Sequence, residues 1–502
     1  GALAGIAAVS LGFGMVHGLT VGFGTTLIGE AVDYTIYYFV QSQRERKGRE
    51  DWLKRFWPTV RLGVVTSICG FASLLFSGFP GLAQLGLYSI AGLLAAALVT
   101  RFVLPHLLPA GFRIRELDDV GRKLAAGLAR VQKLRWPVAL LASAAVIVVA
   151  TQHDRLWNPG LSGLNPVSRE AQQLDASLRS DLGAPDLRYL VVVTSPAQET
   201  TLAATERISR HLQLLVDKEV IAGFESPTRF LPSHASQQER QRAIPEKLEL
   251  ERRLTAALAG LPLKPERLAP FVADAENARH LPLLTRKSLE GTSLVLAVDA
   301  LLFQGSNGWT ALLPLRAPTR GSSLMDIDPG AVRAELASAG LSGVYFVDLK
   351  GEFDQLYAAY LKEAILLSLL GFVAIVLVLG LTLRSPVRLL RVLAPLVLAV
   401  ALVIAGLALT GEKMTLLHLV GLLLTVAIGS NYALFFDRGN GGQAEEPHTL
   451  ASLALANATT VIGFGALAFS QVPVLKAIGI TVGPGAVLAL VLSAILARRE
   501  KA

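Results

Sequence analysis

The sequence predicts a polytopic α-helical membrane protein with internally repeated transmembrane halves and one α+β domain outside the membrane. Composition gives the first indication, because the 502 residues are 52% hydrophobic and only 17% charged, whereas a soluble domain is about 25% charged. The second is a series of long apolar runs, which one segment of soluble composition, 153–359, interrupts. The third is that part of this series occurs twice.

Ten apolar runs are long enough to cross a hydrocarbon core of about 30 Å. The region 1–112 holds the first four, at 1–16, 19–40, 59–79 and 83–108. A basic linker at 113–135 precedes a fifth at 136–152. The region 360–502 holds five more, at 360–383, 388–410, 415–436, 450–471 and 475–497.

Basic side chains indicate how these spans are oriented. Arginine and lysine crowd the loops before 59–79 and before 136–152, and they recur at 384–391 and at 498–501. Because positive loops stay in the cytoplasm, all of these loops are predicted inside and 153–359 outside. A nucleic-acid surface is the rival interpretation, but no nucleic-acid-binding motif accompanies the charges, so no nucleic-acid partner is expected.

The segment 153–359 is predicted to fold as a domain of its own. Strands are expected at 187–193, 293–303, 309–315 and 343–349, with helices at 197–217 and 329–339. This order is βαββαβ, a ferredoxin-like arrangement. The polar stretch 236–288 is interpreted as a helical insertion on the open face of the sheet.

A repeat relates the two sets of spans. Residues 66–86 match 459–479 without gaps at a constant offset of 393, and 33–39 match 431–437 at an offset of 398. Duplicated halves are a common transporter architecture. The region 1–112 corresponds to the last four of six spans in its half, so the sequence predicts a longer parent protein with twelve spans and two outer domains.

Two acidic residues stand in the second apolar run, Glu30 and Asp33. A carboxylate at the centre of a membrane helix costs about 2.5–3.5 kcal/mol on insertion scales, so such residues are usually functional. Removal from water favours the neutral form of a carboxyl group, which lets it take up and release a proton near neutral pH. The structural alternative is an aspartate that hydrogen-bonds for helix packing.

The stretch Gly29–Tyr34 resembles the GxxxDY signature of resistance-nodulation-division (RND) transporters of the MMPL type. Three outer stretches, 178–193, 223–233 and 230–245, are similar to predicted exporters encoded beside aryl-polyene and xanthomonadin pigment genes. The resemblance implies a bacterial inner-membrane exporter with a periplasmic porter domain, driven by the proton gradient without another cofactor or a metal. Its substrate would be a lipid or a lipid-like polyene or fatty-acyl molecule.

Within this resemblance, Asp33, Tyr34 and Glu30 are the expected proton relay. Polar residues of the second half are expected to support it within the membrane: Asn431, Tyr432, Thr425, Asn457, Thr459 and Thr460. Asn431 departs from the motif, because it stands where the second half would carry an aspartate and cannot change charge. Besides membrane lipids, a second copy of the chain and a periplasmic carrier protein stay open as partners.

Enzyme activity is not expected. The sequence contains no GxxxxGK[ST] phosphate loop, no HExxH and no CxxC pair. An intramembrane aspartyl protease would need two aspartates, and the second position is Asn431. The remaining alternative is a non-transporting membrane scaffold or lipid sensor of the same fold.

The predicted topology can be tested by cysteine labelling from outside the cell. A reagent that does not cross the membrane should reach cysteines introduced at Ser236 and Gln304 but not at Gln41, because only the first two are predicted outside. Labelling at Gln41 would overturn the topology.

Overall fold

The computed structural model describes residues 1–26, 28–42, 57–107, 118–131, 134–158, 160, 167, 169–181, 188–306, 308–320, 323–438 and 447–496. The chain divides into two compact units, Gly1–Pro166 with Asp354–Ala502, and Val167–Phe353. The second of these units, Val167–Phe353, lies within the predicted outer segment 153–359, whose bounds stay a prediction. Each unit has its own hydrophobic core.

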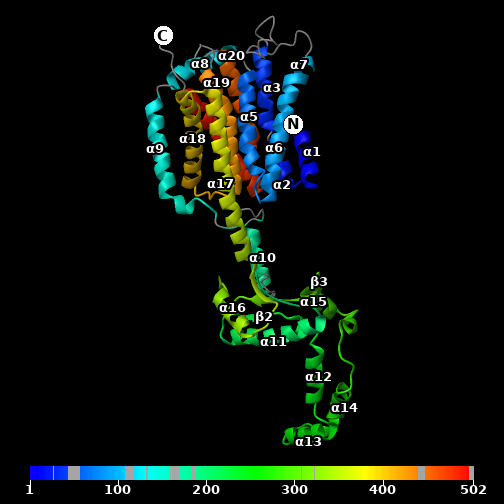
Figure 1. The fold of residues 1–502 in the computed structure, drawn as a ribbon. Coiled ribbons are helices and arrows are strands. Elements are labelled where there is room, and N and C mark those ends of the chain that lie inside the picture. The colour runs from blue at the N-terminus through cyan, green and yellow to red at the C-terminus, as the bar shows by residue number, and fades with distance from the viewer. Residues whose placement is uncertain are drawn as a thin grey trace. The chain divides into compact units, whose positions relative to one another are not determined.

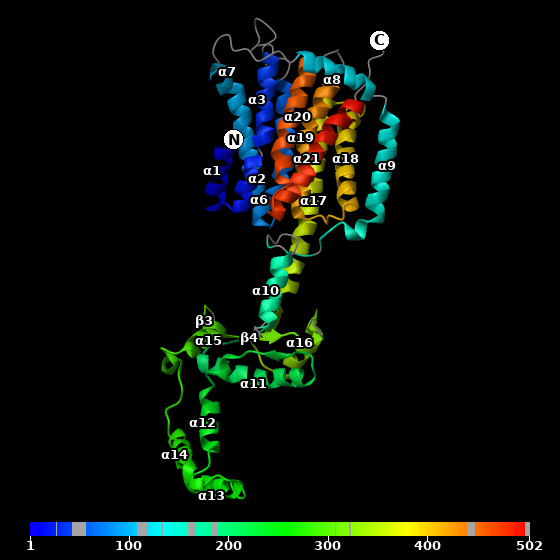
Figure 2. The same cartoon turned by 180° about the vertical axis from the view of Figure 1, so that it is seen from behind.

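The first unit is a set of helices that lie side by side (Figures 1 and 2). Six helices among the described residues are long and apolar enough to cross a membrane, so the chain is a multi-pass membrane protein. They are the continuous run Pro80–Leu107, which joins α6 (Pro80–Leu98), η1 (Val99–Val103) and α7 (Leu104–Leu107), and α17 (Leu349–Leu383), α18 (Pro386–Leu409), α19 (Leu416–Arg438), α20 (Pro447–Leu467) and α21 (Pro473–Leu496).

The other predicted spans correspond to helices that are shorter or less apolar. They are α1 (Ala2–Phe13), α2 (Gly18–Thr26), α3 (Ile28–Ser42), α5 (Trp57–Leu74) and α9 (Arg135–Thr151). In the run expected at 19–40 the described residues belong to α2 and α3, and residue 27 lies outside the described residues. The count of ten spans stays a prediction.

The basic linker 113–135 contains one further helix, α8 (Asp118–Val131), which packs against α20. The contact is close at Gly121, where a Cβ atom would lie 2.1 Å from the carbonyl oxygen of Pro447. Glycine is required at this point because any side chain would collide with the backbone of α20.

Helix α19 forms the centre of the first unit. Apart from the half-buried Leu419, every residue of its apolar stretch Leu416–Asp437 is buried, as expected for a helix that is hydrophobic all round. It packs against α5, α18 and α21. Helix α3 packs against α20, while α19 packs against α5. Since the sequence repeat pairs α3 with α19 and α5 with α20, these two contacts are equivalent in the two halves.

The second unit is built on one antiparallel sheet with the strand order β2–β4–β1–β7. The strands are β1 (Tyr189–Ser195), β2 (Gly223–Phe224), β4 (Gly308–Arg316) and β7 (Val344–Asp348). Tyr189, Val191 and Val193 alternate with less buried neighbours, so one face of β1 enters the core. Helices α11 (Gln198–Asp217) and α16 (Pro329–Ser338) contact each other and the sheet.

The strand expected at 293–303 is wrong. Ser293–Leu301 forms helix α15, and only Leu302–Gly305 is a strand, β3. Both β3 and β2 pair with β4, at residues 308–311 and 315–316 respectively. Because β1 occupies the other edge of β4, β2 and β3 share one edge. The apolar run failed as a predictor because a short apolar helix and a strand cannot be told apart by periodicity alone.

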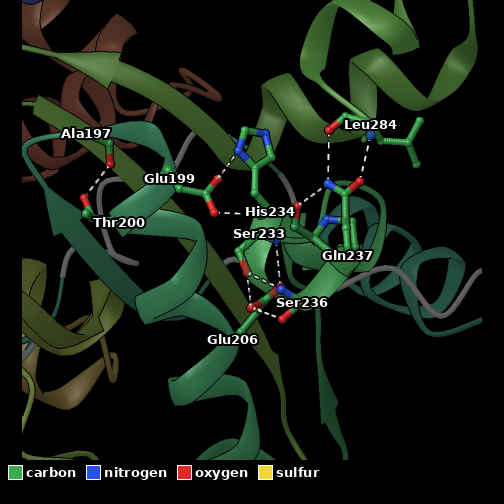
Figure 3. A network of polar contacts seen from close by, with 10 residues as sticks. Ala197, Glu199, Thr200, Glu206, Ser233, His234, Ser236, Gln237 and Leu284 are labelled. Atoms are coloured by element: carbon green, nitrogen blue, oxygen red, sulfur yellow. Dashed lines mark hydrogen bonds and ion pairs between the residues drawn. The ribbon is translucent and has the colours of Figure 1, made fainter. Parts of the chain in front are cut away.

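The predicted insertion, 236–288, is helical, with α12 (His234–Ala243), α13 (Lys247–Ala257) and α14 (Ala269–Ala278). Figure 3 shows how it begins: Glu206 of α11 accepts hydrogen bonds from the backbone N–H of Ser233 at 2.8 Å and from its hydroxyl at 2.6 Å. The hydroxyl of Ser236 donates to the same carboxylate. The first helix of the insertion is thus attached to α11. The sequence had suggested an attachment to the open face of the sheet instead.

This attachment yields a prediction for the intact chain. Glu206→Ala removes the acceptor of three hydrogen bonds, which together contribute about 1–3 kcal/mol to holding the insertion on α11. Limited proteolysis should therefore cut within 234–289 faster in Glu206→Ala than in the unmodified protein. Glu239→Ala, at an exposed position of α12, is the matched control and should not change the cleavage rate. Equal rates for both variants would show that Glu206 does not hold the insertion.

Candidate functional site

A cluster of polar side chains lies inside the first unit, where α3, α5, α19 and α20 meet. Glu30 and Asp33 of α3 are both 0% exposed, three residues apart and hence about one turn from each other on the helix. Their neighbours from the other helices carry hydroxyl and amide groups rather than opposite charges. The two carboxyl groups are thus buried without a basic partner among the described residues.

Glu30 is held by α5. The hydroxyl of Ser67 donates a hydrogen bond of 2.9 Å to Oε1 of Glu30. The second oxygen, Oε2, has no hydrogen-bond partner in the described part of the chain. One oxygen is therefore positioned and the other is available to carry a proton.

Asp33 is the less satisfied of the two acids. Neither of its carboxyl oxygens has a hydrogen-bond partner among the residues that the structure describes. The hydroxyl of Thr459 in α20 lies toward Asp33, but it donates to the carbonyl of Ala456 at 2.8 Å. A buried polar group left unpaired is costly, so the neutral, protonated form is the one that suits this environment.

Asn431 of α19 occupies a notch in α5. A Cβ atom at Gly63 would lie 1.6 Å from Oδ1 of Asn431, so only glycine leaves room for this side chain. One turn away, the hydroxyls of Thr66 and Ser430 are 3.0 Å apart. These contacts fix α19 against α5 and orient Asn431 in the interior.

Three tyrosines complete the cluster. Tyr34 and Tyr37 come from α3 and Tyr432 from α19, and their hydroxyls are buried without a hydrogen-bond partner among the described residues. The ring of Tyr37 packs on Phe435 with centroids 4.9 Å apart. Tyr432 lies beside Asp33 and near Asn457 and Thr460 of α20. The buried hydroxyls thus extend from Asp33 toward α20.

Most of the predicted site residues gather here. Two of them, Asn457 and Thr425, make hydrogen bonds to backbone carbonyl groups away from the acids. The amide of Asn457 donates to the carbonyl of Ala486 at 2.8 Å, which ties α20 to α21. Thr425 donates to the carbonyl of Gly421 at 2.9 Å and packs against Gly485. Thr425 therefore serves the contact between α19 and α21, and its hydroxyl is engaged within α19 and not with either acid.

Sequence reasoning missed Ser67, Gly63 and Ser430. The repeat contained a signal for the first of these, because Thr66 and Ser67 align with Thr459 and Thr460, two residues that were predicted to matter. Gly63 gave no signal, since its role depends on the side chain of Asn431, which is 368 positions away in the sequence.

A different buried acid shows what a structural aspartate looks like in this unit. Asp437, near the end of α19, accepts hydrogen bonds of 2.8 and 2.6 Å from the guanidinium of Arg388. Arg391 lies 3.5 Å away on the other side. Asp437 is thus compensated by two arginines, whereas Asp33 has no such partner among the described residues.

Neither a protein-family model nor a curated protein matches the sequence. A crystal structure of SecDF in its super-membrane-facing form is similar to the chain, with 14% identity and a TM-score of 0.46. The match covers 99% of this chain and 57% of that one, so the chain spans little more than half the length of the SecDF chain. A likeness at this level carries no argument about activity, substrate or partners.

The notch at Gly63 gives a prediction about stability. Gly63→Ala should lower the unfolding free energy by about 1–3 kcal/mol, because the added methyl group overpacks against Asn431. Thermal unfolding in detergent measures the effect, and Gly406→Ala is the control, since a Cβ there has no atom within 4 Å. Asn431→Ala should restore stability in the Gly63→Ala background. Equal stability of the Gly63 and Gly406 variants would show that the notch is not needed.

Proposed function

We propose that this chain is part of a proton-driven exporter and that Asp33 carries the coupling proton. The observation that supports the proposal is the pair of fully buried acids, of which Asp33 has neither a basic partner nor a hydrogen bond among the described residues. Such a group is expensive to keep for packing alone. Its chemistry suits a site that is neutral when occluded and charged when water reaches it.

Each residue of the relay has a defined part in this proposal. Asp33 takes up the proton, and Glu30, whose Oε2 is unpaired, accepts it next or shares it. Ser67 positions Glu30 through its hydrogen bond. The hydroxyls of Tyr34, Tyr37 and Tyr432 are nearby groups that can donate to the charged form of Asp33 when it loses its proton.

The two halves do not contribute equally. The repeat places Ile428 and Asn431 where the first half has Glu30 and Asp33, so the fold itself does not require acids at these positions. The equivalent contacts α3 with α20 and α19 with α5 are those expected if the halves pack about a pseudo-twofold axis. Proton transfer would then use one half, and Asn431 would hold the other half in place.

We also propose a transporter branch, a location and a substrate class for this protein. The GxxxDY stretch at Gly29–Tyr34 supports an MMPL-type member of the RND transporters, resident in a bacterial inner membrane. The strand order β2–β4–β1–β7 is that of a ferredoxin-like fold and supports a periplasmic porter domain. The substrate class that fits this assignment is a lipid or a lipid-like pigment, exported without enzymatic chemistry and without a cofactor other than the proton gradient.

The second candidate function is a membrane scaffold or lipid sensor that does not transport. Asn431 favours it, because it replaces the aspartate that the second half of the repeat would be expected to carry. A scaffold would tolerate the loss of titration at Asp33, whereas a proton-coupled exporter would not.

The deciding experiment is Asp33→Asn in the intact parent protein. This change keeps the shape of the side chain and fixes its charge at zero, so export should be abolished while expression and membrane insertion stay near normal. Glu30→Gln should have a smaller effect. Export is measured as the distribution of extracted lipid between inner and outer membranes over a series of pH values.

Asp437→Asn is the matched control, because it neutralises a buried acid whose role is structural. It should lower thermal stability, by about 1–3 kcal/mol through the weakened hydrogen bonds to Arg388, without removing the pH dependence of export. Normal export by Asp33→Asn at every pH would end the proton-relay hypothesis and favour the scaffold.

A further inference from the structure

An apolar groove lies between α18 and α21, away from the polar cluster. Its volume is about 460 Å³, and its walls are formed mainly by Leu402, Val403, Leu407, Ile480 and Leu488. Val403 and Leu407 belong to a small hydrophobic core behind the groove, together with Met414 and Leu422. Two wall residues are thus packed against this core, and the apolar walls present a surface that suits a hydrocarbon chain.

The middle of the groove is open because of one glycine. A Cβ atom at Gly406 would meet no atom within 4 Å. Thr410, farther along the same helix, turns its hydroxyl back to the carbonyls of Gly406 and Leu407, each at 3.0 Å. Its polar group is therefore satisfied within α18.

Two opposite charges stand at the mouth. Lys476 donates a hydrogen bond of 2.7 Å to Oε1 of Glu412, and both residues line the groove. The two side chains remain 47% and 41% exposed, so their remaining donors and oxygens face outward. On the charge-based topology this mouth lies at the outer side of the membrane, at the depth of lipid headgroups.

The first half of the repeat has a neutral counterpart of this contact. Lys476 aligns with Ala83, and the loop between α1 and α2 is held instead by Gln84, whose amide donates to the carbonyl of Met15 at 3.0 Å. Gln84 is only 1% exposed. The same loop position is therefore fastened in both halves, but only the second half fastens it with accessible charges.

We propose that this groove binds a zwitterionic phospholipid with a phosphate and an ammonium group, of the phosphatidylethanolamine type. One acyl chain lies along the walls past Gly406, the phosphate meets Lys476, and the ammonium meets Glu412. A headgroup with both charges matches both side chains, whereas an anionic headgroup meets Glu412 with repulsion. The site does not depend on proton coupling, so it stands whether the protein is an exporter or a scaffold.

Native mass spectrometry of the intact protein, purified from nanodiscs with equal amounts of phosphatidylethanolamine and phosphatidylglycerol, tests the site. The unmodified protein should retain phosphatidylethanolamine by about fivefold over phosphatidylglycerol, the most that one exposed ion pair contributes. Glu412→Gln leaves Lys476 unpaired and should abolish or reverse this preference. Equal retention of the two lipids by the unmodified protein would overturn the proposal.

A second pair of variants tests the groove itself. Gly406→Leu fills the space beside the acyl chain and should lower the retention of both lipids by about fourfold for each methylene that loses its place on the walls. Gly463→Leu in α20 is the control, because a Cβ there also meets no atom within 4 Å and the residue does not line the groove. Thermal unfolding of each variant shows that it is folded. Unchanged retention in folded Gly406→Leu would also overturn the proposal.

Discussion

The cost of taking a carboxyl group out of water governs the interior of this protein. Three acids are buried in the described part of the first unit: Asp437 beside two arginines, Glu30 with a hydrogen bond from one hydroxyl, and Asp33 with no hydrogen bond there. Asp437, near the end of α19, thus has two positively charged partners, whereas the two acids of α3 have none among the described residues. Removal from water without an opposite charge nearby favours the neutral form of a carboxyl group, and that is the situation of Asp33 among the described residues.

Close helix packing makes this arrangement possible. Helix α19 is buried along its apolar length except at the half-buried Leu419, so its neighbours must approach closely on nearly every side. Small residues allow this approach, as they commonly do between membrane helices. Gly63 admits Asn431, while Gly421 and Gly485 face Thr481 and Thr425 on the side of α21. The same closeness excludes water and thereby raises the cost of each unpaired polar atom.

The two halves share a plan but differ in chemistry at equivalent positions. Asp33 and Glu30 in α3 are matched by Asn431 and Ile428 in α19, and the exposed Lys476 is matched by Ala83, beside the buried Gln84. The first half thus carries its unusual groups in the interior, and the second half carries them at the rim of a groove. A duplicated scaffold has been fitted with different sites, which is consistent with function residing in sites rather than in the fold.

The sequence alone determined that this is a multi-pass membrane protein and identified Glu30, Asp33 and Tyr432 as members of one cluster, because apolar length and rare intramembrane charges are local signals. The sequence also named Asn457, Thr459 and Thr460 as intramembrane polar groups expected to support the relay. The tertiary structure decided that Ser67 holds Glu30, that Gly63 receives Asn431, and that Thr425 serves another contact. It also made 293–301 a helix. In the sheet, β2 and β3 both pair with the same edge of β4. These features depend on which distant side chains meet, and periodicity along the chain carries no information about that.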